Sequence, residues 1–311
     1  MGRVSEPMRP TSRARRGRLA RFTAASAVLL GLAAYVAVHQ VTGSKGAPGC
    51  AVGSGENTYE FTPEQASNAA TISAVGTTRR MPERAVTIAL ATALQESALR
   101  NIKHGDRDSL GLFQQRPSQG WGTPEQILDP VYSSGKFYEG LAKVPGYSRL
   151  PLTVAAQKVQ RSGFPQAYAK HEPEAVLLSA ALTGRSAASL RCSTNMPPDG
   201  RKPGDPAKVR AELVRAFGQK AAPKASASTA GSAGANASGS SAVLSVPVRA
   251  TTGTDAQRGW ELAHWAVARA DELRIVEVSY ADKVWRAGDV SGNWTRADVP
   301  GDGTVRMRLA R

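Results

Sequence analysis

The stretch from Leu94 to Pro117 reads LQESALRNIKHGDRDSLGLFQQRP and places one carboxylate, Glu96, at the end of an apolar segment. The preceding residues, RAVTIALATAL, have the length and pattern of a helix and carry one charge, Arg84, at their start. Such a helix is expected to be largely buried. A charged, unpaired carboxylate at its far end costs on the order of several kcal/mol, or else its pKa rises until it holds a proton near neutrality. Glu96 is therefore a candidate functional residue.

Helix signals surround this stretch. Thr62 and Pro63, followed by Gln65, predict the start of a helix that ends near Gly76. Pro82 predicts the start of the helix that carries Glu96 in its last turn. The polar segment NIKHGDRDSLG then reads as a loop or short hairpin. Further helices are expected over residues 129–144, 152–162 and 165–183.

The chain after residue 195 predicts three more segments. Residues 196–219 read as a loop and an amphipathic helix, PAKVRAELVRAFG. Residues 220–241 contain no large apolar residue and predict a disordered Ala/Ser/Gly linker. Residues 242–311 predict a strand, a helix, a hairpin and a last strand. The expected fold class is mainly α, with a small C-terminal α+β domain.

The N-terminus suggests a membrane anchor. Residues 1–21 hold seven arginines and one glutamate. Residues 22–41 lie in an uncharged run that is long enough to cross a bilayer. The arginines predict a cytoplasmic tail, so the rest of the chain would lie outside a single-pass membrane anchor. A cleaved signal peptide is the alternative, although the run is long for one and lacks a clean small-x-small cleavage site.

The charge of the chain indicates anionic partners. It holds 40 Lys and Arg against 25 Asp and Glu, a net charge of +15, of which the N-terminal tail supplies less than half. This excess suits contact with a cell-wall polyanion, a lipid surface or nucleic acid. No basic stripe interleaved with aromatic residues is present, so a nucleic-acid partner is not expected.

The two cysteines, Cys50 and Cys192, bracket the expected helical domain. In an exported protein two cysteines are more often paired than free, so we expect a disulfide. Lipid attachment at Cys50 is the alternative, but the preceding residues APG lack the leucine-like residue that such a site requires.

Two motifs carry a resemblance to a known family. Gln95-Glu96-Ser97, followed by SLGLFQQ at residues 109–115, resembles the Glu-Ser and Gly-Leu-aromatic-Gln motifs of the lysozyme-like lytic transglycosylases. DPVYSSGKFYEGL is similar to the third motif of the family. AAQKVQRSGFPQAYAKHE is similar to its fourth, Ala-Tyr-Asn-x-Gly, without the Asn.

The resemblance implies a lysozyme-like fold for residues 42–195, with peptidoglycan as the substrate. Glycoside cleavage needs a carboxylic acid that still holds its proton, and Glu96 is the expected general acid and then base. The expected substrate-binding residues are Ser97, Gly111, Gln114, Gln115, Tyr132, Gln160, Ser162 and Tyr168. Gly111 could equally be an ordinary turn glycine, and one of the two glutamines could simply cap a helix.

A second carboxylate would decide the product. Asp106 and Asp108 follow Glu96 on the polar loop and are the candidates. The structural reading, which we favour, is that they pair with Arg107, His104 or backbone N–H groups and stiffen the loop. With Glu96 alone, the resemblance implies a 1,6-anhydro product.

Most aromatic residues in this region are expected in the core, and Tyr132 and Tyr168 are carried as sugar-binding candidates. His104 and His171 have no metal-ligand spacing, so each is expected at a surface or a cap.

The C-terminal segment GWELAHWAVARADELRIVEVSYADKVWRAG distantly resembles zinc D-Ala-D-Ala carboxypeptidases. The closing histidines of that family are replaced here by Thr304 and Arg306, and the one histidine in the segment is His264. We expect no metal and no cofactor, and this domain's protein partner stays unknown.

The leading hypothesis is a membrane-anchored, extracytoplasmic enzyme that cleaves the glycan strands of peptidoglycan. The alternative is a non-catalytic peptidoglycan-binding or scaffolding protein that retains the fold. A transporter is excluded because one span cannot line a pathway.

Overall fold

The computed structural model describes residues 47–194, 196, 202–219, 227–229, 242–250, 252–298 and 301–311. The residues from Ala47 to Arg311 form one compact unit by their contacts. The expected basic tail at 1–21 and the expected span at 22–41 lie outside the described residues, as does most of the expected linker at 220–241.

The expectation of a single-pass membrane protein is corrected. Among the residues that the structure describes, no helix combines the length and the apolar character needed to cross a bilayer. The stretch on which that expectation depended is outside this part of the chain.

The first two helices begin where the sequence predicts. Helix α2 (Pro63–Thr78) begins at a complete capping box, in which the Thr62 side chain accepts from the Gln65 amide and the Gln65 side chain accepts from the Thr62 amide. Helix α3 (Glu83–Ser97) is buried along most of its length and ends at Ala98 in a left-handed conformation. The carboxylate of Glu96 therefore lies at the end of a core helix.

The remaining helices of this part surround α3. The structure has a short 3₁₀ helix η1 (Pro117–Gln119), then α4 (Pro124–Ile127), α5 (Pro130–Ala142) and α6 (Leu152–Gln160). A second 3₁₀ helix, η2 (Pro165–His171), leads directly into α7 (Glu172–Leu182). The single helix expected over 165–183 is thus a 3₁₀ turn followed by an α-helix.

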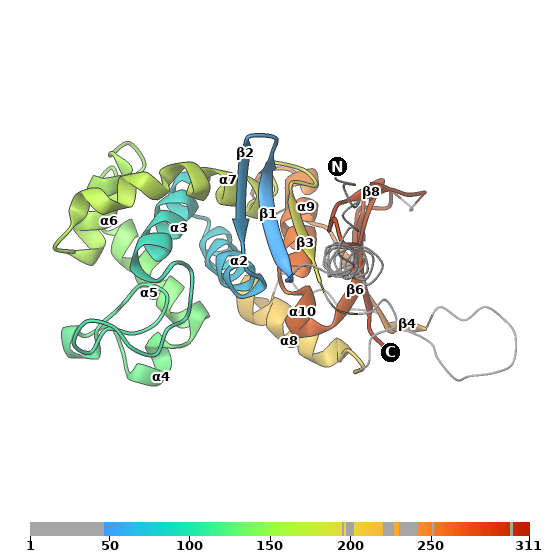
Figure 1. The fold of residues 1–311 in the computed structure, drawn as a ribbon, viewed down its shortest axis with the longest axis horizontal. Helices are drawn as coiled ribbons and strands as arrows, with labels where there is room; N and C mark the ends of the chain where they lie inside the picture. Colours follow the sequence, from blue (N-terminus) through green and yellow to red (C-terminus); the bar gives the residue numbers. More distant parts are fainter. Residues whose placement is uncertain are drawn as a thin grey trace, which may run out of the picture. The chain divides into compact units, whose positions relative to one another are not determined.

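An antiparallel sheet of three strands was not expected. Strands β1 (Gly49–Ser54), β2 (Asn57–Phe61) and β3 (Leu190–Ser193) lie in the order β2-β1-β3 (Figure 1). Cys50 and Cys192 are register partners across β1 and β3, and their side chains form the predicted disulfide. The two ends of the helical region are therefore joined both by a strand pair and by a covalent bond.

The C-terminal part is built on a larger sheet. Helix α8 (Pro206–Phe217) precedes a six-stranded antiparallel sheet of order β4-β5-β9-β6-β7-β8. Helices α9 (Asp255–Ala268) and α10 (Ala270–Leu273) lie between its second and third strands in sequence. The strands are β4 (Ala227–Thr229), β5 (Ala242–Pro247), β6 (Ile275–Tyr280), β7 (Lys283–Arg286), β8 (Thr295–Arg296) and β9 (Thr304–Leu309).

These two sheets correct the expected fold class. The protein is a mixed α+β protein, and the prediction of a mainly α fold with a helical domain was wrong. The helices themselves were visible from their periodicity and caps. The short strands of the first sheet were not, because their pairing joins residues that are far apart in the chain.

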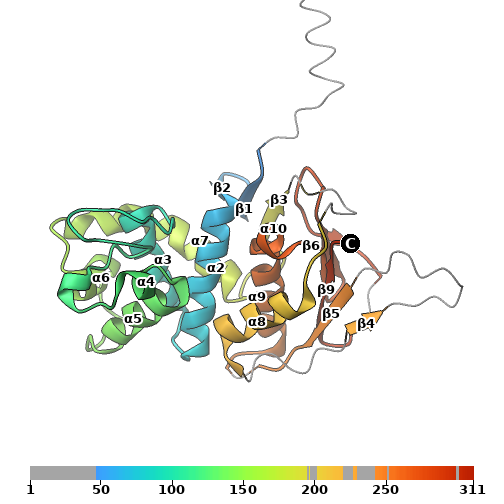
Figure 2. The same cartoon turned by 90° about the horizontal axis from the view of Figure 1, so that it is seen from below.

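The helical part and the C-terminal part share a buried interface. Helix α2 contacts α3 and α5 on one side and α8 and α9 on the other (Figure 2). The indole of Trp285 donates to the carbonyl of Cys192 at 2.9 Å, and that of Trp294 donates to Leu190 at 2.8 Å. Gly184 has φ 74°, and a Cβ there would come within 1.8 Å of the Gln257 carbonyl oxygen, so this close approach requires glycine.

Candidate active site

Glu96 has the environment expected of a proton donor. Its side chain is half-buried at the C-terminal end of α3. Burial is the largest influence on this carboxyl group and raises its pKa, while hydrogen bonding with Tyr168 and Gln160 acts in the opposite direction. The net effect leaves the pKa above its ordinary value of 4.5. Burial at the end of an apolar helix, which singled out Glu96 in the sequence, therefore raises the pKa of its carboxyl group in the structure.

Tyr168 holds Glu96 in place. This tyrosine lies in η2, is fully buried, and its hydroxyl donates to Oε1 of Glu96 at 2.7 Å. Burial and the nearby negative charge of Glu96 raise the pKa of Tyr168, so the phenol stays neutral and remains a donor. The side chain of Ser162 lowers the same pKa, and its hydroxyl oxygen accepts from the Phe164 amide at 3.2 Å.

Gln160 connects Glu96 to the loop that follows α3. It is the last residue of α6, and its amide nitrogen donates to the carbonyl of Phe113 at 2.8 Å. The same side chain lowers the pKa of Glu96. Its oxygen, Oε1, is buried and has no hydrogen-bond partner among the described residues. Gln160 and Tyr168 thus approach Glu96 from two segments that lie more than sixty residues further along the chain.

The SLGLFQQ motif forms a tight turn. Leu110 and Gln115 pair through two backbone hydrogen bonds of 2.9 and 3.0 Å. Gly111 has φ 74°, and a Cβ there would come within 2.7 Å of the Ile127 carbonyl oxygen, so the position demands glycine. The hydroxyl of Ser97 donates to the Leu112 carbonyl at 2.8 Å. Ser97 therefore fastens this turn to the end of α3.

The two glutamines of the motif differ in their surroundings. Gln114 has φ 47° and donates through its side chain to the Gly111 carbonyl at 3.2 Å, so it stabilises the turn. Gln115 is 2% exposed and donates to the carbonyl of Ser133 at 3.2 Å. Its oxygen has no partner among the described residues. Gln115 thus links the turn to α5.

Asp106 and Asp108 are engaged within the loop. Asp108 accepts from the Arg116 guanidinium at 2.6 Å and from the backbone N–H of Ser118 at 2.8 Å. These contacts, with Ser118 first, hold the pKa of Asp108 well below its usual range. Asp106 is exposed and lies 4.0 Å from the guanidinium of Arg107. Asp108 therefore stiffens the loop, whereas the contact of Asp106 is a long one with its neighbour in the chain.

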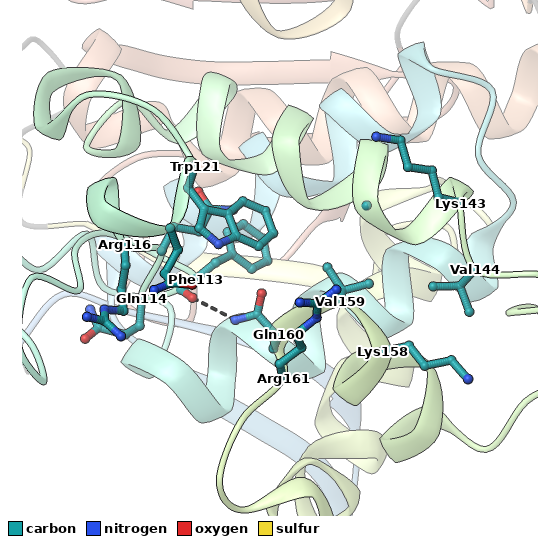
Figure 3. A pocket seen from close by; sticks show the side chains of 13 residues that line it. Phe113, Gln114, Arg116, Trp121, Lys143, Val144, Lys158, Val159, Gln160 and Arg161 are labelled. Carbon is teal, nitrogen blue, oxygen red and sulfur yellow. Dashed lines mark hydrogen bonds between the residues drawn. The ribbon is translucent and has the colours of Figure 1, made fainter.

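A cleft of about 580 Å³ opens beside this turn. Figure 3 shows the side chain of Gln160 pointing toward Phe113, with Arg116 and Trp121 on one side of it. Lys143 and Lys158 lie on the other side. Glu96 is not among the residues that line this space, and Gln160, which both lines it and affects the pKa of Glu96, connects the two. The volume is in the range of sites for small organic ligands.

The aromatic candidates fall in different places. Tyr168 is fully buried against Glu96, as described above. Tyr132 lies on the first turn of α5, where the ammonium of Lys136 is 5.5 Å from its ring centre, and it does not line the cleft. Trp121 does line the cleft, between Gly120 and Gly122. From the sequence, Trp121 is one of several aromatic residues that could stack on sugars, whereas Tyr132 and Tyr168 were the ones predicted to bind.

Four basic residues of the cleft were also missed. Arg116, Lys143, Lys158 and Arg161 come from the turn and from the ends of two helices. Because they are scattered along the sequence, no local charge pattern marks them. Their clustering appears when α5 and α6 are brought together.

The C-terminal part has no evident metal site in the portion of the chain that is described, where no group of three His, Cys, Asp or Glu could hold an ion. His264 is fully buried, its Nδ1 lies 2.8 Å from the carbonyl oxygen of Ala181, and burial lowers its pKa to about 4. Thr304 and Arg306 lie on β9, and Arg306 pairs with Asp302. His264 thus packs in the buried contact between α9 and α7.

Comparison with known families gives one match. A family model described as VldE, C-terminal domain, matches residues 203–306, which run from just before α8 into β9. This is a minority of the chain and does not include the candidate active site. No curated protein matches the chain significantly.

Proposed function

We propose that this protein cleaves the glycan strands of peptidoglycan, with Glu96 as the general acid and then the general base. The observation that carries the proposal is the half-buried Glu96 carboxyl with a raised pKa, held by the neutral phenol of Tyr168. A carboxyl group in such a setting keeps its proton at a pH where ordinary glutamates have lost theirs. The cleft of about 580 Å³, which Gln160 lines, is the proposed site for the sugars next to the scissile bond.

The proposed reaction has two steps. The Glu96 carboxyl first gives its proton to the glycosidic oxygen, and the bond from that oxygen to the anomeric carbon of the muramyl sugar breaks, with the electron pair passing to oxygen. The Glu96 carboxylate then takes the proton of the sugar's own C6 hydroxyl, whose oxygen bonds to the anomeric carbon. The product is a 1,6-anhydro sugar, and Glu96 regains its proton.

The hydrogen bonds of Tyr168 and Asp108 fit a route in which Glu96 is the one reacting carboxyl group. The hydrogen bond from Tyr168 stabilises the carboxylate that exists between the two steps. Asp108 is bound by Arg116 and Ser118, so a route with one carboxylate is the simpler one.

Release of soluble fragments from purified, dye-labelled sacculi tests the proposal. The parent protein should release dye, and Glu96→Gln should release none while its circular dichroism is unchanged. Glu64→Gln is the matched control, because Glu64 is an exposed glutamate on α2. Release by Glu96→Gln at the parent rate would remove Glu96 from the mechanism. Binding of sacculi by both proteins without any release would favour the non-catalytic alternative.

A further inference from the structure

Among the described residues, the lining of the cleft includes four cations and no acidic residue. Its walls include Arg116, Lys143, Lys158 and Arg161. Figure 3 shows these side chains around the same hollow, with the two lysines beyond Val159 as seen from Trp121. Like charges that share a cleft repel one another, and the cleft walls concentrate their field.

Three of these cations lack a counter-ion. Arg116 is paired with Asp108, but Lys143, Lys158 and Arg161 form no ion pair within the part of the chain that the structure describes. All three are exposed. Other basic residues of the helical part, such as Arg79 and Arg185, have carboxylate partners.

Uncharged groups of the same cleft also lack partners. Gln115 is almost wholly buried, and its Oε1 accepts no hydrogen bond from the described residues. The Oε1 of the partly buried Gln160 is also buried and accepts none. A buried acceptor without a donor is unfavourable unless a ligand or water supplies one. These oxygens are closed to solvent, so positive charge is what the cleft presents to a ligand, and this suits a polar chain that carries carboxylates.

We propose that Lys143, Lys158 and Arg161 bind the carboxylates of the peptide stems on the glycan strand. The enzyme would then select strands that carry charged stems over strands of the same sugars without charge. This inference rests on the proposed function for its substrate. It adds a specificity site outside the reacting groups, since the cations act on the stems and Glu96 acts on the glycosidic bond.

Equilibrium binding to the full chain tests this site without turnover. The two probes are soluble stem-bearing glycan strands and the same strands after their carboxyl groups have been coupled to methylamine. Titration calorimetry at low ionic strength should show roughly tenfold tighter binding of the charged strands by the parent protein. Lys143→Gln with Lys158→Gln should remove most of this preference and leave binding of the blocked strands unaffected.

A second pair of lysines provides the control. Lys202→Gln with Lys208→Gln removes the same charge from exposed residues that do not line the cleft, so the preference should persist. Equal binding of the two probes by the parent protein would overturn the inference. So would an unchanged preference after loss of Lys143 and Lys158, or tighter binding of a glycerol phosphate polymer at these lysines.

The inference and the proposed function fail separately. Selective binding of charged strands by a protein that releases nothing from sacculi would contradict the proposed chemistry and support the charged subsite. Glu96-dependent release without any preference between the two probes would support the chemistry and contradict the subsite.

Discussion

The hydroxyl of Tyr168 donates a hydrogen bond of 2.7 Å to Oε1 of Glu96, although the two residues lie 72 positions apart in the chain. Burial raises the pKa of this carboxyl group, and the hydrogen bond lowers it. Removing the Tyr168 hydroxyl therefore leaves the effect of burial on the pKa of Glu96 without this opposing hydrogen bond.

Tyr168→Phe should move the alkaline limb of the pH–rate profile to higher pH. A general acid must be protonated, so the rate falls as the pH rises through the pKa of Glu96. The hydrogen bond favours the charged carboxylate, and its loss raises that pKa further. Initial rates of dye release across a pH series measure the shift.

Tyr147→Phe is the matched control for this experiment. Tyr147 is also a partly buried tyrosine whose pKa burial raises, but it is not among the groups that shift the pKa of Glu96. Its profile should coincide with that of the parent protein. A limb that stays in place for Tyr168→Phe, or moves to lower pH, would contradict the assigned role of the hydrogen bond.

Glu96→Gln should stabilise the protein at alkaline pH. Because the pKa of Glu96 is raised in the folded state, the folded protein binds this proton more tightly than the unfolded chain does. The contribution of Glu96 to stability is therefore greatest below about pH 4.5, the unfolded-state value, and is lost as the pH rises through the folded pKa. Glutamine does not titrate, so its advantage should grow with pH.

Thermal unfolding followed by circular dichroism at pH 4 and pH 8 measures this difference. We expect the Tm of Glu96→Gln to exceed that of the parent protein by a few degrees at pH 8 and to approach it at pH 4. A lower Tm at pH 8 would mean that the carboxylate is stabilising, contrary to the burial argument.

The sequence predicted the helices of the site better than its sheets. The capping box at Thr62 and the apolar run before Glu96 are local patterns, and both helices appear with nearly the expected bounds. Strand β3 has four residues, and its pairing with β1 joins Cys192 to Cys50 across 142 positions. No local sequence pattern predicts such a short strand. The two cysteines nevertheless predicted that the two ends of the helical region meet.

The same contrast holds for the site. Glu96, Ser97 and Gly111 lie in one short stretch, so motif spacing could single them out. Lys143 and Lys158 lie at the ends of different helices, and their proximity depends on how α5 and α6 pack. Charge clusters that arise from packing leave no trace in the local sequence.

Reduction of the Cys50–Cys192 disulfide should lower stability without abolishing the fold. The bond closes a long loop, so the chain-entropy model gives roughly 5 kcal/mol, an upper value because β1 and β3 also pair through their backbones. Non-reducing peptide mapping should recover the two cysteines as one linked pair. Two free thiols, or a Tm that reduction leaves unchanged, would contradict this account.

The interface around Trp285 should make the helical and C-terminal parts unfold together. This side chain is fully buried and donates to the Cys192 carbonyl, so Trp285→Ala leaves a cavity and an unpaired acceptor. A loss of about 3–5 kcal/mol is expected, in a single thermal transition. Val290→Ala is the control, because Val290 is 71% exposed and its truncation should change stability little. Two separate transitions in the parent protein would contradict a shared core.

The central claim is that Glu96 cuts the glycan strand and that the substrate's own hydroxyl closes the product. Mass spectrometry of fragments released from purified sacculi in ¹⁸O-labelled water tests it most directly. The parent protein should release 1,6-anhydro fragments without the label, and Glu96→Gln should release none. Labelled reducing ends would show that water is the acceptor and would give Asp106 or Asp108 a hydrolytic role, while anhydro fragments from Glu96→Gln at the parent rate would contradict the account.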